Sequence, residues 1–297
     1  MRAPPITTGG LGESCFSSSS SRSRFWRRAW RSSARCRARA EFIAADTKPD
    51  AGAPPDPRAT ITRLLRDPRI VADVPLRLAA YTVRNDDPSK VKVIVAIEIG
   101  GGGLGTIDAD VGFEVSTEDG KIVADSLDHV TLTAPDSLTP PMHLTAVLVD
   151  PGAYRLRFAA VDAGGRRGSV DLTLDARLAS AGPLRLSDLM LGRTEDGGFQ
   201  PALSGMDTRR EIAGFLEIYG VPPSGPLTAR LEIAEDLRAP ALATADMTVS
   251  GSDDPTRRMA TGSLDAAALP PGDYIVRAIV FAGGQELGRA SRRLLRR

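Results

Sequence analysis

Apolar and polar residues alternate over many short stretches of this chain, which is the pattern of half-buried β-strands. In residues 90–99, KVKVIVAIEI, a valine or isoleucine occupies every odd position, whereas Lys90, Lys92 and Glu98 lie on the opposite face. Clusters of Asn, Asp, Gly and Pro between such stretches indicate turns. Further strands are predicted in residues 74–83, 108–116, 121–126, 143–149 and 169–178.

Two stretches of the chain, 120 residues apart, resemble each other. Residues 150–168 read DPGAYRLRFAAVDAGGRRG, and residues 270–288 read PPGDYIVRAIVFAGGQELG. Each combines a Pro-Gly turn, an alternating strand, a glycine turn and a further strand, which together form one supersecondary unit. We therefore expect two domains of one type. The recurring residues are Pro151, Gly152, Tyr154, Arg157, Gly164 and Gly168 in the first copy and Pro271, Gly272, Tyr274, Arg277, Gly284 and Gly288 in the second.

The number of strands and the spacing of their turns predict an all-β fold. We expect two immunoglobulin- or fibronectin type III-like β-sandwich domains in tandem, preceded by a disordered basic tail. A short helix is predicted from Asp56 through Leu65, because Asp56 precedes a proline and Ile61, Leu64 and Leu65 share one side. The predicted parts are a Ser/Arg-rich tail with a Pro-rich linker (1–55), a short helix and lead-in (56–70), the first sandwich (71–180), a connector (181–207) and the second sandwich (208–297).

Tyr154 and Tyr274 each stand at the start of a late strand, directly after a Pro-Gly turn. In a sandwich this is the place of a tyrosine corner, whose hydroxyl bonds to a nearby backbone group. We interpret both tyrosines as structural residues, and a surface tyrosine that contacts a ligand is the alternative. The turn residues expected to support the two corners are Pro151, Gly152, Pro271 and Gly272.

Arg157 and Arg277 also recur, three residues after the tyrosines. They alternate out of phase with the apolar face of their strands, so that exposure to solvent is expected. A ligand site shared by the two copies is the alternative.

The charge is distributed unevenly along the chain. The whole chain has a net charge of +1, but nine arginines and one acid, Glu13, give residues 1–40 a charge of +8, and the remainder carries −7. Both cysteines, Cys15 and Cys36, lie in this tail. Its composition favours disorder or a wrongly chosen start codon, while an organellar transit peptide and a nucleic-acid or anionic-surface contact are alternatives. No apolar run predicts a membrane span or a secretion signal.

Gly100, Gly102 and Gly105 have the spacing of the glycines that bind a dinucleotide. That site requires a helix after the glycines, whose N-terminus holds the pyrophosphate. The following residues, TIDADVGFEVS, alternate as a strand does. We therefore interpret the glycines as a loop between two strands.

The chain holds two histidines, His129 and His143. Ser126, Asp128 and His129 are neighbours in sequence, which is not how a catalytic triad is assembled, and two isolated histidines do not predict a zinc site. Acidic pairs are interpreted as turn residues, with a weak calcium site as the alternative. These pairs are Asp108/Asp110, Glu118/Asp119, Glu195/Asp196 and Asp253/Asp254.

Residues 38–46, 64–99, 182–192, 214–220 and 269–292 together resemble the β-rich C-terminal region of bacterial von Willebrand factor A-related proteins of the Acidobacteria type. In that family an A domain precedes β-rich modules, and the proteins are often exported. The resemblance implies an extracytoplasmic protein, although this chain shows no signal peptide. The DxSxS metal-binding pattern of the A domain is absent from the sequence, so no metal ligand is carried over. A truncated reading frame, or a protein that has lost its A domain, is the expectation that follows.

These observations predict a non-enzymatic structural or protein-interaction protein without catalytic, cofactor-binding or metal-binding residues. Its expected partners are proteins, with no nucleic acid and no membrane span. A carbohydrate- or ligand-binding accessory module is the alternative, and it would need exposed aromatic rings. An enzyme, such as a hydrolase, would need a pocket in which polar groups converge on His129 or His143.

Overall fold

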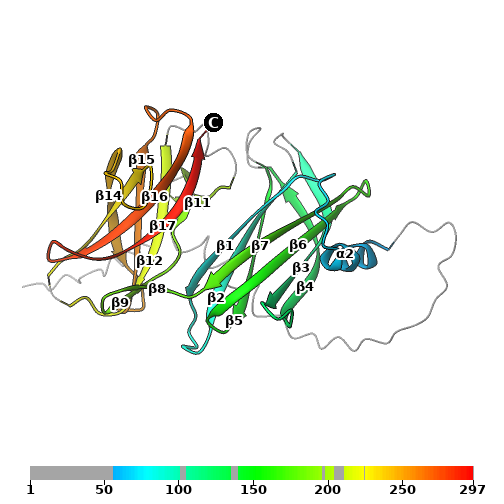
Figure 1. Ribbon diagram of the computed structural model, residues 1–297, viewed down its shortest axis with the longest axis horizontal. Helices are drawn as coiled ribbons and strands as arrows, with labels where there is room; N and C mark the ends of the chain where they lie inside the picture. Colours follow the sequence, from blue (N-terminus) through cyan, green and yellow to red (C-terminus); the bar gives the residue numbers. More distant parts are fainter. Residues whose placement is uncertain are drawn as a thin grey trace, which may run out of the picture.

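The computed structural model describes residues 56–100, 105–134, 140–195, 198–203, 211–223 and 225–296, and the predicted basic tail lies outside them. The fold of these residues is all-β and sandwich-like, and it contains a single helix (Figure 1). The elements are α2 (Pro57–Arg66), β1 (Leu76–Arg84), β2 (Val91–Ile99), β3 (Thr106–Thr117), β4 (Ile122–Thr133), β5 (Met142–Val149), β6 (Gly152–Asp162), β7 (Arg167–Ala176), β8 (Ala179–Ala181), β9 (Leu184–Leu186), β10 (Met190–Glu195), β11 (Gly198–Pro201), β12 (Glu211–Tyr219), β13 (Leu227–Ala234), β14 (Ala243–Gly251), β15 (Arg257–Asp265), β16 (Gly272–Ala282) and β17 (Gln285–Arg296).

Strands β1–β7 form two facing antiparallel sheets, called here the N-terminal β-unit. One sheet has the order β1-β2-β5 and the other the order β4-β3-β6-β7. Because side chains alternate along each strand, the inward positions of both sheets meet in one apolar core. Val95, Ile97, Phe113, Leu156 and Phe158 belong to this core. The alternation seen in residues 90–99 therefore marks the inner face of β2, as predicted.

The helix α2 covers part of the outer face of the four-stranded sheet. It begins at Asp56, whose carboxylate accepts a hydrogen bond from the backbone N–H of Arg58, and Pro57 occupies the first turn. Ile61, Leu64 and Leu65 pack against Ala159 and Val161 of β6. The predicted helix and its buried side are thus present, and Figure 1 shows it at the end of the molecule away from the C-terminal strands.

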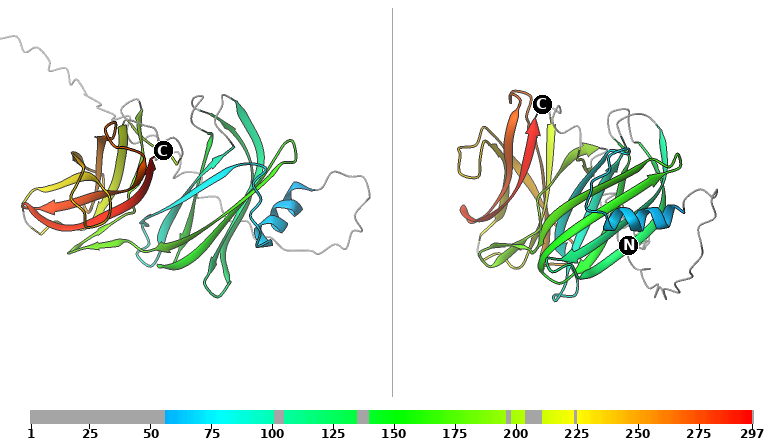
Figure 2. Two further views of the ribbon diagram at one scale, coloured as in Figure 1. Left: turned by 45° about the horizontal axis from the view of Figure 1, so that its top comes forward. Right: turned by 45° about the vertical axis from the view of Figure 1, so that its right-hand side comes forward.

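Strands β8–β17 form the C-terminal β-unit. Its two halves have the orders β10-β12-β15 and β14-β13-β16-β17, and β14 pairs with a strand of each half. Ala243 to Met247 are bonded to β13, and Thr248 to Gly251 are bonded to β15. The two halves are therefore joined into one continuous network of strands. Figure 2 shows the two β-units side by side in two further views.

The C-terminal β-unit repeats the pairing order of the N-terminal one. β10, β12 and β15 correspond to β1, β2 and β5, whereas β14, β13, β16 and β17 correspond to β4, β3, β6 and β7. In both units, the segment that precedes the three-stranded sheet lies close to the last strand, which is β7 in the first unit and β17 in the second. A Cβ added to Gly168 would lie 2.5 Å from the carbonyl oxygen of Val74, and one added to Gly288 would lie 2.6 Å from the Cβ of Ala181. These two recurring glycines leave room for the lead-in segments.

The segment expected to be a connector, residues 181–207, contributes strands to the C-terminal β-unit. β9 and β10 both pair with β12, and β10 also forms a hairpin with β11. Leu184, Leu186, Leu189 and Leu191 are buried in the core of the C-terminal β-unit. The leucine spacing of this segment therefore serves the second core.

Candidate functional site

The two recurring tyrosines occupy equivalent places. Tyr154 stands near the start of β6, and its hydroxyl donates to the carbonyl oxygen of Asp150 at 2.8 Å. Tyr274 stands near the start of β16, and its hydroxyl donates to the carbonyl oxygen of Pro270 at 2.9 Å. Both bonds reach four residues upstream, across the Pro-Gly turn, as a tyrosine corner does. The turns consist of Pro151 and Gly152 in the first copy and Pro271 and Gly272 in the second, and in each the ring lies against the glycine.

The expectation that Arg157 and Arg277 are exposed is wrong, because 7 % and 5 % of their surfaces are accessible. Each lies on the outer face of its sheet, but another segment covers it. Arg157 donates to the carbonyl oxygen of Arg69 in the lead-in after α2, at 3.0 Å. Arg277 donates to the carbonyl oxygens of Leu237 and Ala239 in the loop between β13 and β14. The alternation of residues correctly predicted the face of the sheet on which each arginine lies. It could not predict which segment covers that face.

Each buried arginine pairs with a carboxylate that also binds a second arginine. Asp171 of β7 lies 3.1 Å from Nε of Arg157 and also pairs with Arg155. Glu232 of β13 lies 2.7 Å from Arg277 and 2.8 Å from Arg230. The acid therefore comes from a different neighbouring strand in each unit, and these groups fasten the covering segments to the sheets.

The two histidines lie apart and in different environments. His129 of β4 is exposed and lies 2.8 Å from Asp108 and 3.2 Å from Asp110, both on β3. The hydrogen bond to Asp110 and the charge of Asp108 raise the pKa of His129. Burial lowers the pKa of His143 on β5, which lies near the ring of Phe158. Ser126 bonds to Asp128 rather than to a histidine, so these residues do not assemble a triad.

The described residues contain no group of three or more His, Cys, Asp and Glu side chains that could hold a metal ion. Gly100 directly follows β2 with a positive φ of 88°, and Gly105 leads directly into β3 rather than into a helix. Gly102 lies outside the described residues. A hollow of about 480 Å³ beside Tyr274 is lined in part by Asp273 and Arg293, which form an ion pair. Neither histidine lines this hollow.

A cluster of side chains from both β-units lies at their junction. Its apolar part consists of Ala79, Tyr81 and Val83 of β1, with Ala96 of β2, packed with Met190 and Phe215 of the C-terminal β-unit. These residues lie on the face of β1 and β2 that points away from the first core. Glu98 on the same face is 1 % exposed, and its carboxylate accepts a hydrogen bond from the backbone N–H of Leu203.

A polar bridge flanks this apolar contact. The N–H of Thr82 donates to the carboxylate of Asp188 at 2.7 Å, and the N–H of Asp188 donates to the carbonyl oxygen of Thr82 at 3.0 Å. The guanidinium of Arg292 on β17 lies over the ring of Tyr81, 4.3 Å from its centroid. Burial raises the pKa of both Tyr81 and Asp188. The loop between β9 and β10 is therefore fixed to β1 through its backbone as well as its side chains.

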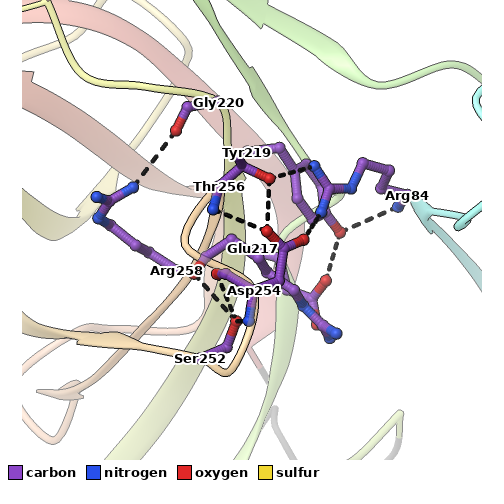
Figure 3. A network of polar contacts seen from close by, with 9 residues as sticks. Arg84, Glu217, Tyr219, Gly220, Ser252, Asp254, Thr256 and Arg258 are labelled. Carbon is purple, nitrogen blue, oxygen red and sulfur yellow. Dashed lines mark hydrogen bonds and ion pairs between the residues drawn. The ribbon is translucent and has the colours of Figure 1, made fainter.

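Arg84, the last residue of β1, reaches into the second polar part of the junction (Figure 3). Its guanidinium pairs with the carboxylate of Asp254 and bonds to the hydroxyl of Thr256 at 3.0 Å, in the turn between β14 and β15. Asp254 is oriented by the turn itself, because its other oxygen accepts from the N–H and the hydroxyl of Thr256. The hydrogen bond from the Thr256 hydroxyl is the main reason why the pKa of Asp254 is lowered.

The backbone of Arg84 is held as well. Its N–H donates to the hydroxyl of Tyr219 at 3.0 Å, and its guanidinium lies 4.8 Å from the centroid of that ring. The hydroxyl of Tyr219 in turn donates to Glu217, which forms an ion pair with Arg257. Burial, followed by the charge of Glu217, raises the pKa of Tyr219. Arg84, Tyr219, Glu217 and Arg257 thus form a continuous path of polar contacts from one β-unit to the other.

Reasoning from the sequence alone did not find this junction. The available signal was that apolar residues occupy both faces of residues 76–83, since Ala79, Tyr81 and Val83 interrupt a simple alternation. A strand whose two faces are both apolar is buried on both sides. The arrangement provides a fixed orientation of two similar units, and it brings together no nucleophile, base and electrophile of the kind that catalysis requires.

The comparisons with known proteins give distant similarities. No protein-family model and no curated protein matches the sequence. A transglutaminase from red sea bream is 13% identical, with a TM-score of 0.25, over 75% of this chain and 31% of that protein. A DUF3823 family protein from Bacteroides ovatus is 10% identical, with a TM-score of 0.28, over 75% of this chain and 100% of that chain. The chain thus spans less than a third of the transglutaminase, and at these scores neither likeness assigns a function.

In the part of the chain that the structure describes, no helix is long and apolar enough to cross a bilayer.

Proposed function

We propose that this chain is a non-enzymatic structural or protein-interaction protein, built of two immunoglobulin- or fibronectin type III-like sandwiches that are held in one orientation. The observation that carries the proposal is the junction around Arg84, where apolar packing and a polar path join two units of equal strand order. Contacts of this kind restrict the domain motion that is expected when an interface is small and polar. The fixed orientation suits a protein that presents two surfaces at a set distance.

The strand order supports the choice of sandwich type. A three-stranded sheet of the first, second and fifth strands faces a four-stranded sheet of the fourth, third, sixth and seventh. A tyrosine at the start of the sixth strand bonds to the backbone upstream in both units. These are features of the immunoglobulin and fibronectin type III group of folds. The resemblance of the sequence to the β-rich region of von Willebrand factor A-related proteins leads to the same proposal.

The carbohydrate-binding alternative has less support. In the residues that the structure describes, no phenylalanine or tyrosine side chain is exposed, since Phe199 and Phe281 are half-buried and the others are buried. A sugar-binding face normally offers exposed aromatic rings on which sugars stack. A glycan array probed with the full chain tests this alternative, and specific binding of one glycan class would favour it over the scaffold.

The scaffold proposal is tested by measuring the distance between the units in solution. Spin labels on Ile122→Cys and Val221→Cys report this distance, because both side chains are exposed and lie in different units. Cys15 and Cys36 are replaced by serine in the same chain. We expect one narrow distance distribution, which broadens when Tyr81→Ala or Arg84→Ala loosens the junction. A broad distribution in the labelled chain without these changes would contradict the proposal.

A further inference from the structure

The strand β4 is an edge strand over its whole length. It pairs with β3 from Ile122 to Thr133, and among the described residues no other strand forms a ladder with it. In an antiparallel pair, the N–H and C=O groups of alternate residues point away from the partner strand. Those of β4 are therefore able to pair with another extended chain, and natural proteins usually shorten, bend or cover an edge of this length.

The C-terminal β-unit closes the equivalent edge. Its strand β14 passes from β13 to β15, so that Thr248 to Gly251 are bonded to the other sheet. In the N-terminal β-unit, β4 forms its ladder with β3 and β5 forms its ladder with β2, and no ladder between the described residues of β4 and β5 joins the two sheets. The side of this sandwich that is bordered by β4 and β5 is called here the open side.

Polar side chains of β4 point into the sandwich at the open side. Ser126 lies opposite Phe113, and Asp128 lies opposite Val111. Because Phe113 and Val111 belong to the first core, and directly paired residues share one face of a sheet, Ser126 and Asp128 lie on the inner face. The hydroxyl of Ser126 donates to the carboxylate of Asp128 at 2.6 Å. The inner face of β4 thus carries a hydrogen-bonded acid.

The strand β5 contributes two further polar side chains to the inner face. His143 lies opposite Ile97 and Thr145 lies opposite Val95, and both partners are core residues. Burial lowers the pKa of His143, although the charge of Asp128 acts in the opposite direction. At pH 7 the imidazole is therefore neutral, and it does not balance the negative charge of Asp128.

The topology of the sandwich does not require polar residues at these positions. In the C-terminal β-unit, β14 and β15 correspond to β4 and β5, and the inward side chains of both strands belong to an apolar core. These side chains are Ala243, Ala245, Met247 and Val249 of β14 and Ala260 and Leu264 of β15. The polar groups therefore occur in the unit whose edge stays free and not in the unit whose edge is closed.

Charge decides which extended segment fits the edge of β4. Residues 105–134, the hairpin of β3 and β4, carry seven acids and one lysine. Asp125 and Asp128 lie on opposite faces of β4, so an added strand meets a carboxylate on either face. A second copy of β4 would bring carboxylates close to one another, and like charges opposite each other destabilise strand pairs. A segment that carries lysine or arginine complements this edge.

We propose that β4 binds an extended basic segment of another protein, which pairs with its edge as a further antiparallel strand and places a lysine or arginine opposite Asp128. The main chain of the segment supplies affinity, and its side chains supply specificity. On the inner face, the next position on one side lies beside Val130 and is apolar, and the next position on the other side lies beside Ser126 and is polar.

This pairing rests on the protein-interaction role proposed above. It can fail while the fixed orientation of the two β-units is confirmed, because the spin-label distance is measured without any peptide. A fixed orientation can equally fail while β4 still binds a basic strand. The two sets of measurements therefore distinguish the two proposals.

Synthetic nine-residue peptides, which match residues 124–132 in length, provide the probe. The lysine peptide has lysine at the fifth position, arginine at the second and eighth, threonine at the fourth and seventh, and valine elsewhere. The glutamate peptide differs only in having glutamate at the fifth position. Binding to the full chain is measured by fluorescence anisotropy. We expect the lysine peptide to bind about tenfold more tightly than the glutamate peptide, because like charges across an interface are costly.

The variant Asp128→Asn tests where the central lysine binds. We expect it to reduce the preference for the lysine peptide from about tenfold to about twofold or less. The control Glu235→Gln removes an exposed acid of the C-terminal β-unit and is expected to leave the preference unchanged. Equal binding of the two peptides by the unchanged chain would overturn the proposal, and so would a preference that survives Asp128→Asn.

Main-chain pairing is tested with methylated peptides and hydrogen exchange. Only alternate N–H groups of an added antiparallel strand point toward β4. N-methylation of one alternate set in the lysine peptide should therefore weaken binding by about tenfold or more, and methylation of the other set should not. A saturating amount of the lysine peptide should slow exchange of the β4 amides about tenfold and leave the β14 amides unchanged. Equal effects of the two methylated sets, or unchanged exchange on β4, would overturn the proposal.

Discussion

Arg277 and Glu232 form an ion pair of 2.7 Å beneath the loop between β13 and β14, and the side chain of each is only 6 % exposed. The pair fastens the loop to the outer face of the sheet, because Arg277 also donates to two loop carbonyls. In the N-terminal β-unit, Arg157 pairs with Asp171 and donates to the carbonyl oxygen of Arg69 in the segment after α2. The repeat thus preserves a buried arginine while the covering segment differs.

Removing one partner of the Arg277–Glu232 pair is expected to be costly. Arg277→Leu leaves a buried carboxylate that keeps only Arg230, and we expect a loss of about 3 kcal/mol in the free energy of unfolding. The double variant Arg277→Leu/Glu232→Leu is expected to lose less. Arg293→Ala, which removes an exposed ion pair with Asp273, serves as the control with a loss below about 1 kcal/mol. Urea unfolding measures all three, and equal losses for the single and the double variant would contradict the expectation.

The two tyrosine corners are expected to contribute similarly. Tyr154→Phe and Tyr274→Phe keep the buried ring and remove one hydrogen bond each, to Asp150 and to Pro270. We expect each to lower the free energy of unfolding by about 1 kcal/mol. Urea unfolding followed by residue-resolved spectra assigns each loss to its own unit. An unchanged stability in either variant would show that the hydroxyl has no structural role there.

Asp188 is expected to make the junction sensitive to pH. Burial raises its pKa above the usual value, so the folded protein binds this proton more tightly than the unfolded chain does. The resulting contribution to stability is present in acid and is lost as the pH rises from the ordinary aspartate pKa through the raised one.

Asp188→Asn keeps an oxygen that can accept from the N–H of Thr82 and removes the buried charge. We therefore expect the variant to be at least as stable as the unchanged chain at pH 7, with the difference shrinking as the pH falls toward 4. Unfolding midpoints measured across this range test the sign. A variant that is less stable than the unchanged chain at pH 7 would show that the attraction between Asp188 and Arg292 outweighs the cost of burying the charge.

The two histidines are expected to titrate on opposite sides of the usual value of 6.5. The hydrogen bond that His129 donates to Asp110 raises the pKa of His129, and burial lowers the pKa of His143. NMR titration of the ring protons measures both in one sample. Asp110→Asn is expected to lower the pKa of His129 and to leave that of His143 unchanged. Coincident titration curves for the two rings would contradict the described surroundings.

Gly288→Ala is expected to disturb the packing of the lead-in on β17. The added methyl group would lie 2.6 Å from the Cβ and 2.8 Å from the Cα of Ala181, so that backbone must move. We expect a loss of about 1–3 kcal/mol in the free energy of unfolding. Gly251→Ala is the control, since a Cβ there meets nothing within 4 Å. Thermal unfolding measures the stability of both variants. Equal losses of stability in Gly288→Ala and Gly251→Ala would contradict the expectation.

Much of the fold could be predicted because it depends on local patterns. Alternation located most strands, and the Asp56-Pro57 pair with the spacing of Ile61, Leu64 and Leu65 located the helix. The Pro-Gly-x-Tyr repeat placed Tyr154 and Tyr274 at equivalent positions. In each case the signal and the structure that it predicts lie within a few residues of each other.

What could not be predicted depends on segments distant in sequence. Alternation placed Arg157 and Arg277 on the outer face, but only the folded chain brings residues 69 and 237–239 over them. The same holds at the junction, where Arg84 meets Tyr219 and Asp254, 135 and 170 residues further along. Burial of a polar face is decided by what packs on it, and one sequence without its fold does not show that.

The two β-units differ in what covers the outer face of their four-stranded sheets. α2 places Ile61, Leu64 and Leu65 on the N-terminal unit, whereas Arg230, Arg277 and a loop cover the C-terminal one, with Arg230 lying over the ring of Phe281. Salt screens buried ion pairs far less than exposed ones, and the side chains of Arg277 and Glu232 are each 6 % exposed. Added salt should therefore leave the loop over the C-terminal sheet in place much as it leaves α2 in place on the N-terminal sheet.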